Sequence, residues 1–144
     1  MISRLLPVLG SLIILTLTSY PVFSQNSADE VTNSADQSDT LYVREMVLAQ
    51  DVVERTPIDV VQAFDVSDGE AWAFARIFNT GPLRNVIFKW YYEESLYYTF
   101  EAKVGTSKNW RTYSSVTLRE GAWRVEMEDH KGNQLKEIRF HVSE

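Results

Sequence analysis

The sequence lacks cysteine altogether, and this absence excludes three kinds of chemistry along the whole chain. Without a thiol there is no disulfide, no cysteine nucleophile and no thiolate ligand for a metal ion. A lipid-modified cysteine is excluded as a membrane anchor for the same reason. The fold must therefore be stabilised by packing, hydrogen bonds and ion pairs.

Histidine is scarce, with 2 residues in 144. His130 falls in a predicted turn and His141 on the outward side of the last predicted strand, so we interpret both as solvated surface residues. Ser114–Ser115 lies within a predicted strand, without the strained turn of a nucleophile elbow, and the acidic pair Glu93–Glu94 is typical of a solvated turn. We predict no enzymatic activity, no metal site and no cofactor.

Positive charge is also in short supply, since 14 Lys and Arg residues stand against 20 Asp and Glu residues, a formal net charge of −6. A nucleic-acid-binding domain needs a basic excess to displace counterions from phosphates. Nucleic acid is therefore not expected as a partner, whereas an envelope protein or an acidic ligand stays open.

The one long hydrophobic run extends from Leu5 to Leu17, after the basic Arg4. Small residues near Ser24 have the spacing that a signal peptidase reads, so we predict a signal peptide over residues 1–24 and a periplasmic or secreted protein. The alternative is an uncleaved inner-membrane anchor formed by residues 5–23, because a membrane span needs about 20 mostly apolar residues. Membrane contact is expected only through this segment.

The rest of the chain divides by composition into a tether and one domain. Residues 25–40 are acidic and contain few apolar side chains, which predicts a flexible acidic linker. Residues 41–144 are of the usual size for one domain with one core. In this domain, apolar and polar residues alternate in strand-like segments, at 41–53, 62–66, 71–79, 85–92, 96–104, 109–118, 123–128 and around 138–142.

Alternation with turn signals between short segments is typical of an all-β fold. We predict an antiparallel two-sheet sandwich of the immunoglobulin-like kind, with about seven strands, in which Thr56-Pro57 ends the first strand. A small β-barrel is the alternative. In the pairs Trp110-Arg111 and Trp123-Arg124, each tryptophan is expected to point inward and its arginine outward.

Several segments of the domain resemble the domain of unknown function 2914 family of bacteria. They are Lys89-Trp90-Tyr91, Trp110-Arg111-Thr112-Tyr113-Ser114-Ser115, Gly121-Ala122-Trp123-Arg124-Val125, and the later residues Asp129, Gly132 and Phe140. The resemblance covers Val43 to Val142 and implies a compact β-domain at the cell envelope, alone or attached to other modules, without an established activity. The family often has a histidine where this chain has Phe88, so no histidine-based role is implied.

The candidate binding residues are Lys89, Tyr91, Arg111, Tyr113 and Arg124. If they project from one sheet, they form a cationic surface with aromatic planes, suited to a carboxylate, an acidic sugar or an acidic protein loop. The alternative is that the arginines form cross-strand ion pairs with Glu101, Glu126 or Glu128.

Two functions stay open. The first is a non-enzymatic protein-interaction or structural module of the cell envelope, and the second is a carbohydrate-binding domain that uses exposed aromatics and arginines. The exposure of the tryptophans distinguishes them, because a sugar platform needs a flat aromatic row in solvent.

Overall fold

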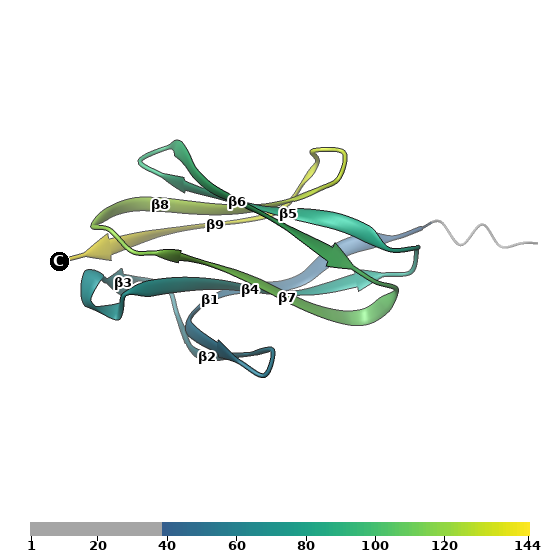
Figure 1. Cartoon of the computed structure of the whole chain (residues 1–144), viewed down its shortest axis with the longest axis horizontal. Coiled ribbons are helices and arrows are strands. Elements are labelled where there is room, and N and C mark those ends of the chain that lie inside the picture. The colour runs from purple at the N-terminus through teal and green to yellow at the C-terminus, as the bar shows by residue number, and fades with distance from the viewer. Residues whose placement is uncertain (1–38) are drawn as a thin grey trace, which may run out of the picture. The chain divides into compact units, whose positions relative to one another are not determined.

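The computed structural model describes residues 39–144, which form two β-sheets stacked as two layers (Figure 1). The strands are β1 (Leu41–Val53), β2 (Thr56–Val61), β3 (Phe64–Asp65), β4 (Glu70–Asn79), β5 (Arg84–Tyr92), β6 (Ser95–Val104), β7 (Ser107–Thr117), β8 (Gly121–Asp129) and β9 (Gln134–Ser143), with a 3₁₀ turn at Val66–Asp68. The predicted sandwich is confirmed, and the number of strands is nine rather than about seven.

The strand order is that of an immunoglobulin-like sandwich and not of a closed barrel. One sheet has four strands in the order β2-β1-β4-β7, and the other has five in the order β3-β9-β8-β5-β6. All neighbouring strands are antiparallel except β3 and β9, which pair in parallel at Phe64 and Val142. The edge strands of the two sheets are therefore β2, β7, β3 and β6.

The first strand ends at Val53, before Thr56-Pro57 as expected, but a second strand that was not predicted, β2, begins at Thr56 and pairs with β1. Pro57 stands opposite Val52 on an edge strand, where its missing N–H costs no ladder hydrogen bond. The turn consists of Glu54 and Arg55, both with positive φ (49° and 57°). This backbone usually takes asparagine or glycine, so the sequence carried no turn signal here.

The β1–β2 hairpin (residues 48–61) lies on the side of the four-stranded sheet that faces away from the other sheet (Figure 1). On this outer face of the sheet, the Phe74 side chain is fully buried, although it points away from the core between the sheets. The alanines at 71, 73 and 75 face the core between the sheets. The alternation of small and large residues in β4 is thus explained, since both faces of the strand are covered.

Aromatic side chains fill the space between the sheets. Trp90 is fully buried, and its Nε1 donates a hydrogen bond to Ser114 Oγ across the two layers at 3.1 Å. Trp123 is also buried, and its Nε1 donates to the carbonyl of Arg119 at 2.8 Å. Trp110 is half-buried on the inward face of β7. The predicted orientation of the two Trp-Arg pairs is confirmed.

The predicted signal peptide, residues 1–24, lies outside the described residues, as does the linker prediction up to residue 38. The last two linker residues contact the domain. Asp39 forms an ion pair with Arg84 at 3.0 Å, and the Thr40 N–H donates to Thr80 Oγ1 at 3.0 Å. Among residues 39–144 no helix is long and apolar enough to cross a membrane.

Candidate binding surfaces

The structure separates the five candidate binding residues onto two different sheets. Lys89 and Tyr91 lie on β5 and Arg124 on β8, all on the outer face of the five-stranded sheet. Arg111 and Tyr113 lie on β7, on the outer face of the four-stranded sheet. They therefore form no common cationic surface, and each group has to be considered separately.

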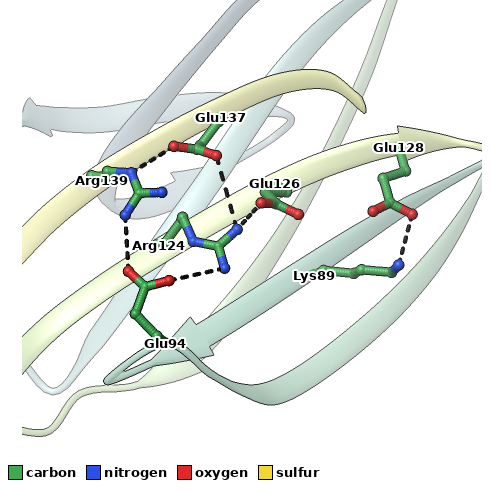
Figure 2. Close-up of polar contacts among 7 residues, drawn as sticks. All are labelled: Lys89, Glu94, Arg124, Glu126, Glu128, Glu137 and Arg139. Atoms are coloured by element: carbon green, nitrogen blue, oxygen red, sulfur yellow. Dashed lines mark hydrogen bonds and ion pairs between the residues drawn. The ribbon is translucent and has the colours of Figure 1, made fainter. Parts of the chain in front are cut away.

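On the five-stranded sheet, Arg124 is the centre of an ion-pair network (Figure 2). Its guanidinium contacts Glu126, lies 3.2 Å from Glu94 and 3.9 Å from Glu137, and is 3.8 Å from the centre of the Tyr91 ring. The Arg124 side chain is 12% exposed. The expected ion pair of Arg124 with Glu126 is present, but it lies within β8 and not across strands; the cross-strand partner is Glu137 on β9.

The neighbouring cations on this face are paired too. Arg139 lies 2.9 Å from Glu94 and 2.7 Å from Glu137. Lys89 Nζ lies 2.7 Å from Glu128, and this hydrogen-bonded carboxylate raises the pKa of Lys89 above its ordinary value. Because carboxylates of the same sheet already neutralise these cations, this face offers little to an anionic ligand.

Arg111 has different surroundings on the four-stranded sheet. Its cross-strand neighbour is Arg76, whose Nε lies 3.1 Å from Glu45 in an ion pair without hydrogen-bond geometry. Arg111 itself has no ion-pair partner within residues 39–144. Tyr113 is partly exposed, and its ring packs against Trp72 with 5.7 Å between centroids.

The edge strand β6 carries the surface that sequence reasoning missed. Its segment Ser95–Glu101 is exposed throughout and includes large apolar side chains, namely Leu96 (57% exposed), Tyr97 (38%), Tyr98 (43%) and Phe100 (36%). Phe100 points toward the core as its alternation predicted, and its ring lies 6.4 Å from that of Phe88. It stays partly exposed because β6 is the last strand of its sheet, which alternation alone does not reveal.

A groove of about 420 Å³ lies between β6 and β7, the adjacent edges of the two sheets. Tyr97 and Tyr98 line it from β6, and Ser115, Val116 and Thr117 line it from β7. Arg119 lies over the Tyr97 ring at 5.3 Å. The free edge of β6 and this groove together can accept an extended chain and some of its side chains.

The polar residues that could support catalysis are dispersed or used structurally. No group of three His, Asp or Glu side chains within residues 39–144 is arranged to hold a metal ion. Desolvation acts to raise the pKa of Asp129, but hydrogen bonds from Asn133 and from the Lys131 N–H lower it overall. Asp129 therefore organises the β8–β9 turn as a carboxylate.

Comparison with known proteins finds one family model that matches the second half of the domain. Residues 84–142 match the family described as "Protein of unknown function (DUF2914)". The resemblance inferred from the sequence is thus confirmed over these residues, and residues 43–83 lie outside the match. No curated protein matches the chain.

Among solved structures, a β-glucosidase from Kluyveromyces marxianus is similar over 74% of this chain, with a TM-score of 0.45 and 9% sequence identity. The matched region spans 15% of the length of that enzyme.

Proposed function

We propose that this protein is an exported, non-enzymatic interaction module of the cell envelope that binds an extended segment of a partner protein along β6. The observation that carries the proposal is the long, exposed and apolar edge of the five-stranded sheet. Within the described residues, no strand pairs with the other side of β6.

Edge strands with free backbone groups are normally protected by shortness, proline, charge or a bulge. The other edge of the same sheet, β3, has 2 residues, and the edge strand β2 contains Pro57 and Asp59. In contrast, β6 has 10 residues, and its segment from Ser95 to Phe100 contains no charge. Its one irregularity is a register shift at Tyr97, beside the β5–β6 turn. Such an edge, if left open, would favour aggregation, so a dedicated partner explains why it is kept.

The groove beside β6 fits the way in which added strands are recognised. Backbone hydrogen bonds to a sheet edge provide affinity, and pockets for alternate side chains provide specificity. Tyr97, Tyr98 and Val116 form an apolar lining at this edge. We therefore expect a partner segment with apolar side chains at every second position.

The burial of the tryptophans supports a protein ligand over the carbohydrate alternative. Trp90 and Trp123 lie in the core, and Trp72 and Trp110 are half-buried. In addition, the Trp72 ring packs against Tyr113 on the outer face of the four-stranded sheet, and the β1–β2 hairpin lies on that side of the sheet (Figure 1). A flat row of exposed indoles, which a sugar-stacking platform needs, is not found among residues 39–144.

The test is a selection of ten-residue peptides from a random display library against the full chain. Selected peptides should bind the wild type and lose binding to Tyr98→Lys. Tyr42→Lys is the matched control, because Tyr42 is as exposed as Tyr98 (42% and 43%) but lies on the other sheet. Thermal unfolding of both variants verifies that they remain folded.

Backbone recognition is tested with N-methylated versions of one selected peptide. Methyl groups on the alternate amides that face β6 should abolish binding, whereas methyl groups on the intervening amides should not. Equal effects from both series, or equal binding by Tyr98→Lys and wild type, would contradict strand addition. Export is tested separately, by recovery from the periplasmic fraction and by a mature N-terminus at Gln25.

A further inference from the structure

A pocket of about 380 Å³ lies between the tip of the β1–β2 hairpin and the first half of β7. Arg55 lines it from the hairpin tip, and Ser107, Asn109, Trp110 and Arg111 line it from β7. None of these residues is acidic. The pocket is thus built from two segments that are distant in sequence, with a guanidinium group on each.

The polar groups of the pocket are donors without protein acceptors. Within the described part of the chain, neither Arg55 nor Arg111 forms an ion pair or a side-chain hydrogen bond. Ser107 Oγ accepts the N–H of Asn109 at 3.0 Å, so its own proton stays available, as does the side-chain amide of Asn109. A group that accepts several hydrogen bonds and carries negative charge complements this lining.

The charges around Arg111 also favour a negatively charged ligand in this pocket. Arg111 stands directly opposite Arg76, and like charges in this register destabilise a sheet. Glu45 balances Arg76 at 3.1 Å, but no carboxylate of residues 39–144 balances Arg111. On the five-stranded sheet, by contrast, every cation of the Arg124 network has a carboxylate partner (Figure 2).

We propose that this pocket binds an oxyanion, a carboxylate or a sulfate group, between the guanidinium groups of Arg55 and Arg111. Planar guanidinium groups bind such oxygens in forked pairs, with the Asn109 amide as a further donor. The bound anion supplies the missing counter-charge for Arg111 and links the hairpin tip to β7. The site is separate from the β6 edge and does not depend on the function proposed for it.

The experiment is a titration of the full chain with sodium sulfate and with sodium acetate, at constant ionic strength, followed by amide chemical shifts. Wild type should show saturable shifts at Asn109 and Arg111. Arg55→Met and Arg111→Met should each weaken binding roughly tenfold, because each removes a charge-assisted hydrogen-bond donor. Arg44→Met is the matched control, since Arg44 lies over the Phe78 ring at 5.3 Å and does not line the pocket.

Shifts that do not saturate, or an equal loss in Arg44→Met, would show general screening of positive charge and overturn the proposal. A uronic-acid oligosaccharide added in a parallel titration identifies the source of the group. Tighter binding than acetate assigns the site to a polymer-borne carboxylate, and equal binding assigns it to a free small anion. Retention of anion binding by Tyr98→Lys keeps this test independent of the β6 edge.

Discussion

Replacement of Arg124 by methionine tests whether the network on the five-stranded sheet is structural. Arg124 stands beside Glu126 and Glu137, which are direct cross-strand neighbours on β8 and β9. Without the guanidinium, two carboxylates face each other in the position where like charges destabilise a sheet. Glu126, which is buried, would also lose the one ion-pair partner that it has among the described residues.

The expected cost follows from the burial of the closest pair. The side chains of Arg124 and Glu126 are 12% and 10% exposed, so solvent screens their interaction only weakly. Removal of one partner from a buried pair costs about 3–5 kcal/mol, and we expect about 3 kcal/mol because Glu137 and Glu94 are more exposed. In a domain of this size the melting temperature should fall by roughly 12 °C or more.

Urea unfolding of the full chain, followed by tryptophan fluorescence, measures this free energy. Arg124→Met with Glu126→Met should recover most of the loss, since the double variant leaves no unpaired buried carboxylate. Arg111→Met, on the other sheet, is the control and should change stability by less than about 0.5 kcal/mol. A loss below about 1 kcal/mol in Arg124→Met, or no recovery in the double variant, refutes the structural role.

Three further changes test the turns and the core. Trp90→Phe should cost about 1–3 kcal/mol of unfolding free energy in urea, because Ser114 loses its buried hydrogen-bond donor. The pKa of Asp129 is lower in the folded state than its unfolded value of 3.8, so the carboxylate stabilises the fold above pH 3.8. This stabilisation is lost as pH falls through the folded pKa. The difference in melting temperature between wild type and Asp129→Ala should therefore shrink as the pH is lowered over this range. Gly121→Ala should lower the melting temperature, because Gly121 has φ +135° and an added Cβ would collide with Glu93.

The sequence was sufficient to predict the faces of the strands in the second half of the domain. Alternation placed Trp123 inside and Arg124 outside, and the resemblance to a known family covered the same segments. This worked because side-chain direction in a strand depends on local periodicity. The prediction of two layers followed from the number and spacing of such segments.

The sequence was not sufficient where the outcome depends on distant neighbours. The β1–β2 turn uses Glu54 and Arg55 in a left-handed conformation that other residues usually adopt, so the residue types at the turn did not indicate it. The edge position of β6 is set by strand order, and the alternation of Tyr98 and Phe100 is the same as that of a central strand. Alternation could therefore not reveal the β6 edge, and the sequence named Arg111 as a candidate but not Arg55 beside it.

The two Trp-Arg pairs show how strand order separates a structural arginine from one available to a ligand. Both arginines point outward by the same local rule. Arg124 is on the central strand β8, between β5 and β9, and carboxylates reach it from β8 itself, from β9 and from the β5–β6 turn. Arg111 is on the edge strand β7, which has β4 as its one neighbour, and that neighbour presents Arg76. In this domain, the outward arginine on the central strand is therefore neutralised within its sheet, whereas the one on the edge strand has no carboxylate partner among residues 39–144.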